Sequence, residues 1–113
     1  MAPMKGITDW MFRKTFSEHF EGFDLSVAPF IASKRDYKIK RKFVRDVLPE
    51  NNERMPVIPQ ILSKSGEDFA FLANYLYDLG HETVNWNLGC PSPMVAGKKR
   101  GSGMLPHPEM IDI

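Results

Sequence analysis

The chain has 113 residues, of which 42% are hydrophobic and 12% aromatic, a composition typical of a globular protein with at most one domain. Its formal net charge of +1 excludes a strongly acidic or basic protein, and its single cysteine excludes an internal disulfide. No apolar run approaches the roughly 20 residues that cross a bilayer, so we expect a soluble protein of the cytoplasm with no membrane partner.

The first elements expected along the chain are a helix and a buried strand. Thr8 and Asp9 precede apolar residues at helical spacing, which predicts a helix that is capped at this pair and stopped by Gly22, with Asp9 favourably placed at the positive end of the helix dipole. The apolar run 24–31 (DLSVAPFI) then predicts a buried strand. A strand ahead of the helix would have to lie within residues 1–4.

A basic segment follows at residues 34–48, where Tyr37 and Phe43 are interspersed among seven lysines and arginines. The pattern predicts a loop and a short helix that ends at Pro49. The cations either form a solvated helix face, which is the usual case, or contact the phosphates of a nucleic acid. The sequence favours neither interpretation.

The second half of the chain continues with a strand and a helix. Residues 56–62 (PVIPQIL) predict a buried strand in which Pro59 interrupts the regular hydrogen-bond ladder. Ser65 and Asp68 match a capping box that opens a helix, and Gly80 is placed to end it.

Two further elements complete the pattern. Residues 83–88 (TVNWNL) alternate polar and apolar side chains, which predicts a third strand, and residues 107–113 (HPEMIDI) predict the start of a helix. Strands that alternate with helices indicate a parallel sheet with crossover helices, so the expected fold class is α/β.

The loop after the third predicted strand, residues 87–103 (NLGCPSPMVAGKKRGSG), contains the single cysteine. In parallel α/β folds, the loops after the carboxyl ends of strands carry the functional site. A free thiol is mostly protonated near neutral pH, so Cys90 is either a proton donor or, if activated, a nucleophile. No histidine lies near it in sequence, which favours proton donation. An isolated cysteine is, however, also common as a small buried apolar residue.

Other polar residues near the predicted strand ends are candidate ligand contacts. The three cations of residues 98–100 lie among glycines, and backbone N–H groups together with cations favour an anion such as phosphate, although no nucleotide-binding fingerprint is matched. Asn85 and Asn87 either hydrogen-bond a planar heterocycle or satisfy backbone groups at a strand end. A buried amide at Gln60 needs partners, and a ligand is one source of them.

Four segments, in the same order, resemble the tRNA-dihydrouridine synthase family: residues 2–13 (APMKGITDWMFR), 49–52 (PENN), 56–62 and 84–109 (VNWNLGCPSPMVAGKKRGSGMLPHPE). The most specific part is the asparagine, glycine, cysteine and proline pattern with its glycine-rich continuation. The resemblance covers nearly the whole chain. It implies an FMN-dependent enzyme that reduces uridine in tRNA to 5,6-dihydrouridine, with NADPH as the usual electron source.

The resemblance also implies roles for residues after the third strand. Cys90 matches the general acid that gives a proton to C5 of the uracil ring after hydride from the reduced flavin has reached C6. Asn87 matches the asparagine that lies near both the flavin and the substrate uracil. Asn85 stands where the family often has an acidic residue. The end of the loop resembles the part that meets tRNA phosphate, and its cations are Lys98, Lys99 and Arg100.

The remaining implied contacts are to the cofactor. Pro3 and Met4 match a turn that lies against the FMN, and Gln60 matches a flavin-contacting glutamine on a barrel strand. A target base in folded tRNA has to leave its stack to reach the flavin, so shape and charge are expected to dominate its recognition.

The family's catalytic domain is a (βα)8 TIM barrel of about 250 residues, followed by a helical domain. Residues 1–113 are therefore expected to form roughly the first four βα units, the N-terminal half of one FMN-binding domain, with no second domain. A half barrel exposes sheet edges and an apolar face, so we expect self-association and no activity of this fragment alone. Two alternatives are a dihydroorotate-dehydrogenase-like FMN enzyme and a non-catalytic half barrel that binds nucleic acid.

Overall fold

The computed structural model describes residues 1–112, in which short strands alternate with helices and pair in parallel. The helices are α1 (Trp10–His19), α2 (Arg41–Val44), α3 (Gly66–Asp78) and α4 (Pro93–Ala96); the strands are β1 (Ser26–Val27), β2 (Ile31–Ala32), β3 (Val57–Ile58), β4 (Gln60–Leu62) and β5 (Asn85–Trp86). This mixed α/β fold with parallel strands is consistent with part of a TIM barrel. Within residues 1–112, no helix is long and apolar enough to cross a membrane.

Each of the first two predicted strands is divided in two at a proline. β1 pairs with β3, while β2, β4 and β5 form a second parallel sheet in the order β2-β4-β5. Residues 24–32 and 56–62 therefore each contribute one strand to each sheet. Pro29 and Pro59 lie at the two breaks, because a residue without an N–H cannot continue a hydrogen-bond ladder. The interruption predicted at Pro59 is confirmed.

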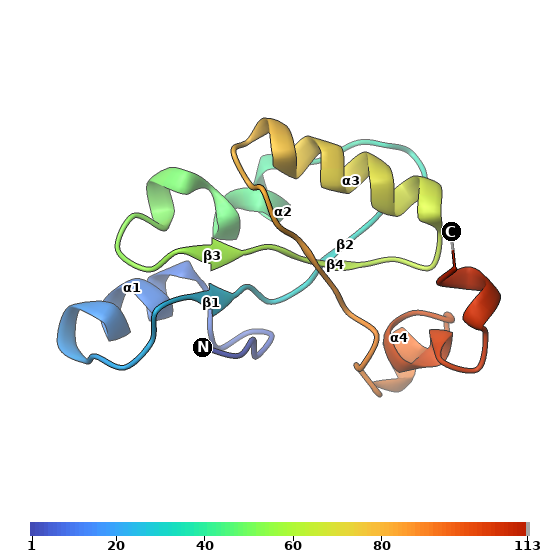
Figure 1. Cartoon of the computed structure of the whole chain (residues 1–113), viewed down its shortest axis with the longest axis horizontal. Coiled ribbons are helices and arrows are strands. Elements are labelled where there is room, and N and C mark those ends of the chain that lie inside the picture. Colours follow the sequence, from blue (N-terminus) through green and yellow to red (C-terminus); the bar gives the residue numbers. More distant parts are fainter. Residues whose placement is uncertain (113) are drawn as a thin grey trace.

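The register of β4 separates an apolar face from a polar face. Ile61 pairs with Ile31 on one side and Trp86 on the other, while Gln60 pairs with Asn85. Successive side chains of a strand point to opposite faces, so Ile61 joins the core while Gln60 and Asn85 face away from it. Figure 1 shows α3 along one side of the strands and α4 near the end toward which β4 and β5 run.

The core lies between α3 and the strands. The apolar residues that form it come from α2 and the segment after it, from α3 and from the strand regions, and are at most 7% exposed: Ala28, Ile31, Val44, Val47, Leu48, Ile61, Leu72 and Leu76. Trp86 of β5 extends this packing, because its ring lies 4.7 Å from that of Phe69 in α3, centroid to centroid. The apolar faces of one helix and three strands thereby cover one another.

Both predicted helix starts are capped. Asp9 accepts a hydrogen bond from the backbone N–H of Phe12 at 2.9 Å, and Ser65 Oγ accepts one from the N–H of Asp68 at 3.3 Å. Such side-chain acceptors satisfy N–H groups that have no partner within the helix. Gly80 follows the end of α3 with a φ of +108°, as expected for a glycine at that position.

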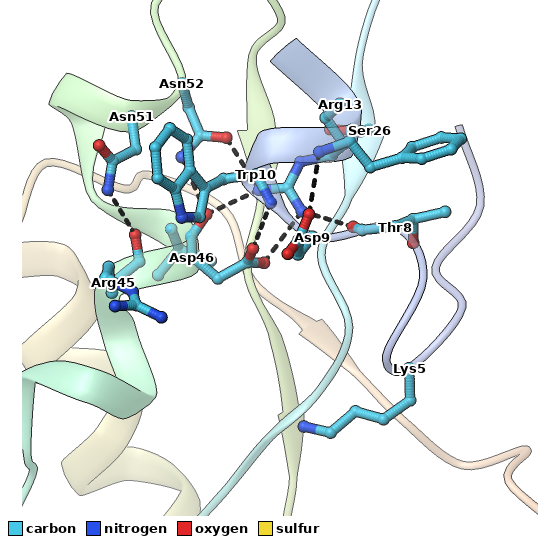
Figure 2. A network of polar contacts seen from close by, with 12 residues as sticks. Lys5, Thr8, Asp9, Trp10, Arg13, Ser26, Arg45, Asp46, Asn51 and Asn52 are labelled. Atoms are coloured by element: carbon cyan, nitrogen blue, oxygen red, sulfur yellow. Dashed lines mark hydrogen bonds and ion pairs between the residues drawn. The ribbon is translucent and has the colours of Figure 1, made fainter. Parts of the chain in front are cut away.

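A buried arginine joins α1 to the segment after α2. The guanidinium of Arg13, which is 1% exposed, donates to the Asp46 carboxylate at 2.9 Å and to the Asp46 carbonyl at 2.6 Å. It also donates to the Thr8 carbonyl at 2.8 Å and to Asn52 Oδ1 at 2.9 Å. The backbone N–H of Trp10 donates to the same carboxylate, as Figure 2 shows. One ion pair thus links the first turn of α1 to a segment more than thirty residues away.

The strand considered for residues 1–4 is not formed. The Met1 amino group donates to the Leu25 carbonyl at 2.7 Å, and the Val27 N–H donates to the Met1 carbonyl at 3.0 Å, so Met1 does lie beside β1. The chain then turns, since the N–H groups of residues 7 and 8 donate to the carbonyl of Met4.

The helix predicted for residues 107–113 is also not formed in its described part, and Ile113 lies outside the described residues. A 3-10 turn at Pro108–Met110 takes its place. Its hydrogen bonds join residues three apart, from Met110 to His107 and from Ile111 to Pro108, which winds the backbone more tightly than an α-helix. The first helix was likewise predicted too long, because α1 ends at His19.

Candidate functional site

A cavity of about 460 Å³ lies where β5 ends, on the face of the sheet opposite α3. Its lining residues come from the N-terminal turn, the break between β1 and β2, β4, β5 and the segment after β5: Pro3, Lys5, Pro29, Phe30, Gln60, Asn85, Trp86, Asn87, Leu88, Gly89 and Cys90. We refer to it as the Cys90 cavity. Parallel α/β folds bind their ligands at the carboxyl ends of strands, so its location is that of a ligand site.

A chain of side-chain amides runs through the Cys90 cavity. Gln60 Nε2 donates to Asn85 Oδ1 at 2.8 Å, and Asn87 Nδ2 donates to Gln60 Oε1 at 2.9 Å. Asn87 Oδ1 in turn accepts from the backbone N–H of Gly89 at 3.1 Å and from that of Cys90 at 3.0 Å. A primary amide carries two N–H donors, so within residues 1–112 Gln60 and Asn87 each keep one for a bound molecule.

Cys90 is a free, partly exposed cysteine and one of the residues that line this cavity. Its carbonyl accepts hydrogen bonds from the backbone N–H and from the hydroxyl of Ser102, both at 3.0 Å. Asn87 and Ser102 therefore hold the backbone of Cys90 from two sides. A thiol at the wall of a cavity can pass its proton to a bound molecule, which a thiol packed in the core cannot do.

The structure brings four of the predicted site residues together. Pro3, Gln60, Asn87 and Cys90 all line the Cys90 cavity, although they come from three separate parts of the chain. Met4 does not line it, and its side chain is 55% exposed. The position of Met4 is explained by the turn that begins there, in which its carbonyl accepts two backbone N–H groups.

The three predicted phosphate-binding cations lie elsewhere. Lys98, Lys99 and Arg100 line a second cavity of about 490 Å³, which we call the basic cavity. Its other lining residues come from the segments after β2 and β4, from α3 and from the end of α4: Ser33, Arg35, Lys64, Asp68 and Gly97.

Lys5 and Phe30 are among the residues of the Cys90 cavity that the sequence prediction missed. Lys5 Nζ donates to the Phe30 carbonyl at 3.0 Å and lies 4.7 Å from the centre of the Phe30 ring, so a positive charge sits beside an aromatic face at the wall of the cavity. The only signal for Lys5 was its place directly after Pro3 and Met4. Phe30 carried the signal of a strand core residue, and the break at Pro29 puts it at the cavity instead.

Known proteins resemble this chain along nearly its whole length. A family model described as dihydrouridine synthase matches residues 1–112. The chain is 29% identical to the tRNA-dihydrouridine(16) synthase of Haemophilus ducreyi, over 98% of this chain and 35% of that protein. It is 30% identical to the probable tRNA-dihydrouridine synthase 2 of Bacillus subtilis and 31% identical to a probable tRNA-dihydrouridine synthase of Staphylococcus epidermidis, in both cases over 96% of this chain and 33% of the relative.

The chain thus spans about a third of the length of these curated relatives. Within that third the match is continuous, and the family resemblance expected from the sequence motifs is confirmed. Because the family model covers nearly every residue, the chain belongs to the dihydrouridine synthase family.

Proposed function

We propose that this chain is part of an FMN-dependent tRNA-dihydrouridine synthase, which reduces uridine in tRNA to 5,6-dihydrouridine. The observation that carries the proposal is the position of Cys90, a lining residue of a polar cavity at the end of a parallel strand, with its backbone held by Asn87 and Ser102. Membership of the family and the names of the relatives support the same reaction.

Cys90 acts in this proposal as the general acid. When bound, reduced FMN supplies a hydride to C6 of the uracil ring, and NADPH supplies the electrons that regenerate it. The Cys90 thiol gives its proton to C5, so the C5–C6 double bond is lost, and the thiolate regains a proton from water. A well-placed general acid contributes about 10²- to 10⁴-fold in rate, which requires the fixed backbone that the amide chain provides.

The Cys90 cavity fits the isoalloxazine ring of FMN in its chemistry. A flat heteroaromatic ring needs hydrogen-bond donors at its polar edge and apolar surface against its faces. Gln60 and Asn87 each offer one amide N–H, Pro3 offers apolar surface, and Lys5 places a positive charge at the wall. We propose these four residues as FMN contacts, with Met4 contributing the turn that positions Pro3.

The wider context follows from the same proposal. Residues 1–113 correspond to the N-terminal part of one FMN-binding barrel domain, acting on tRNA in the cytoplasm. The two small sheets of residues 1–112 do not close on each other, and β2 and β5 each have an unpaired edge there. We therefore expect the chain to be inactive until further strands complete the barrel.

A chimera tests the proposal directly. Residues 1–112 replace the matched third of the Bacillus subtilis relative, and dihydrouridine in an unmodified tRNA transcript is measured by mass spectrometry after nuclease digestion. The chimera should form dihydrouridine with NADPH. Its Cys90→Ala variant should retain FMN content and NADPH oxidation by the flavin, and lose about 10²-fold or more of product formation.

Two outcomes would contradict the assignment of Cys90. If Cys90→Ala forms product at the unchanged rate, another group donates the proton. If it loses FMN in parallel with product, the cysteine serves packing. The Gln60→Leu variant is the matched comparison, because it should lower the affinity for FMN while leaving the thiol in place.

A further inference from the structure

We propose that the basic cavity binds the phosphodiester backbone of the RNA beside the reactive uridine, and that Arg35 and Lys64 contact it together with the three cations of residues 98–100. Arg35 and Lys64 have no assigned role from the family resemblance. The identification of the ligand as RNA rests on the proposed function. The location and the charge of the site come from the structure alone.

The cations of this cavity converge from three separate segments. Arg35 follows β2, Lys64 follows β4, and residues 98–100 follow α4, which comes after β5. The strands β2, β4 and β5 are adjacent and parallel, so the segments after them emerge at the same edge of the sheet. Figure 1 shows α4 and the chain after it near that edge. The cations are distant in sequence, and they lie close together because the three parallel strands end at the same edge of the sheet.

The positive charges of the basic cavity outnumber the negative ones, and none of them forms an ion pair within the described residues. The basic cavity holds five cations and one carboxylate, that of Asp68. The ion pairs found in residues 1–112 involve Arg13, Arg41 and His107, none of which lines the cavity. Five positive charges gathered around about 490 Å³ repel one another, and an anion with several negative charges relieves that repulsion.

Two details of residues 98–100 point to the same kind of ligand. The Nε–H of Arg100 is buried and has no hydrogen-bond partner within the described residues. Lys99 adopts a left-handed backbone with a φ of +55°, which is unfavourable for a lysine. A phosphodiester offers charged oxygen acceptors and favours guanidinium and ammonium donors, whereas a neutral ligand would leave the charges uncompensated.

The segment that follows the cations of the basic cavity packs against the backbone of Cys90. Gly101 directly follows Arg100 and packs so closely that a Cβ atom there would lie 2.8 Å from the Cys90 carbonyl oxygen. Ser102 donates twice to that same oxygen. A uridine whose ring lies at the Cys90 thiol brings its flanking phosphates with it, because each nucleotide of RNA carries one. The cations are placed to receive them.

The test measures binding of a fluorescently labelled, unmodified tRNA transcript to the 113-residue chain by anisotropy over a series of salt concentrations. Arg35→Gln and Lys64→Gln are compared with Lys14→Gln, which removes one positive charge from the exposed face of α1. Each cavity variant should weaken binding about five- to eightfold near about 0.1 M salt and reduce the slope of log affinity against log salt by about 0.7–0.9. Lys14→Gln should change neither quantity. Circular dichroism of each variant confirms that the fold is retained.

Every other outcome overturns the inference. Equal losses in all three variants would mean diffuse attraction rather than a site, and unchanged binding of the cavity variants, or no saturable binding by the chain, would exclude a backbone contact there. Inorganic phosphate is the second probe. It should displace tRNA from the wild-type chain more than chloride of equal ionic strength does, and equal displacement by the two anions would contradict a phosphate contact. None of these results bears on the Cys90 chimera, so the proposed function is judged separately.

Discussion

Replacing Arg13 by methionine should be among the most damaging single changes to the stability of this chain. Figure 2 shows its guanidinium between the first turn of α1 and the segment that contains Asp46 and Asn52. Methionine retains most of the apolar stem and removes four hydrogen bonds, two of them to Asp46. The carboxylate of Asp46 would be left with the backbone N–H of Trp10 as its one remaining donor in the network.

The magnitude follows from the burial of the two partners. Breaking a buried ion pair by removing one member costs about 3–5 kcal/mol. Two features of the structure favour the lower end of this range. The Asp46 side chain is 24% exposed, so water can partly solvate the abandoned charge. The Nε–H of Arg13 is buried and has no hydrogen-bond partner among residues 1–112, which already weakens the native arrangement. We therefore expect a loss of about 3 kcal/mol in the free energy of unfolding.

Urea unfolding, followed by tryptophan fluorescence, measures this loss. Lys14→Met on the exposed face of the same helix is the matched control, and it should change stability by less than about 0.5 kcal/mol. Asp46→Asn, alone and combined with Arg13→Met, completes a double-mutant cycle in which the two effects should not add. A loss below about 1 kcal/mol for Arg13→Met, or full additivity in the cycle, would refute the view that this ion pair joins the two segments.

Four further predictions concern the site, the core, a cap and the open edges. Gly101→Ala should destabilise the chain by about 2 kcal/mol and raise the rate of Cys90 alkylation, because residue 101 has a φ of +56° and a Cβ there would press on the Cys90 carbonyl. Gly89→Ala should have neither effect, because a Cβ at residue 89 meets nothing within 4 Å. Leu76→Ala should cost about 2–5 kcal/mol in urea unfolding, since Leu76 is fully buried. Ser65→Ala should cost about 1 kcal/mol through the lost cap of α3, measured in the same way. The chain should self-associate through its unpaired strand edges, and light scattering after size-exclusion chromatography that shows a compact monomer at all concentrations would contradict this.

The parts of the fold that depend on local chemistry could be predicted from the sequence. Asp9 and Ser65 cap helices because an acceptor side chain satisfies the free N–H groups of the first turn whatever lies around it. Pro59 breaks a strand because it lacks an N–H in any context. The same holds for Cys90, whose place just after a strand was enough to put it at the carboxyl edge of the sheet.

The parts that depend on pairing between distant segments could not be predicted. Arg13 and Asp46 are 33 residues apart, and no periodicity in either segment indicates the other. Arg35 belonged to a basic stretch that read equally well as a solvated face, and it was the topology of the strands that put it beside Lys64. Met4 was expected at the cofactor with Pro3, but the turn that starts there leaves its side chain exposed.

The register of β4 determines both the core and the Cys90 cavity, which lie on opposite faces of the sheet. Ile61 packs in the core beneath α3, and the residue before it, Gln60, enters the amide chain that reaches Cys90. A slip of β4 by one residue would exchange these faces, putting an isoleucine into the cavity and an amide against the leucines of α3. The apolar packing of α3 therefore determines where Asn87 and, through it, the backbone of Cys90 are held. Loosening the core without unfolding the chain should accordingly disturb the position of Cys90.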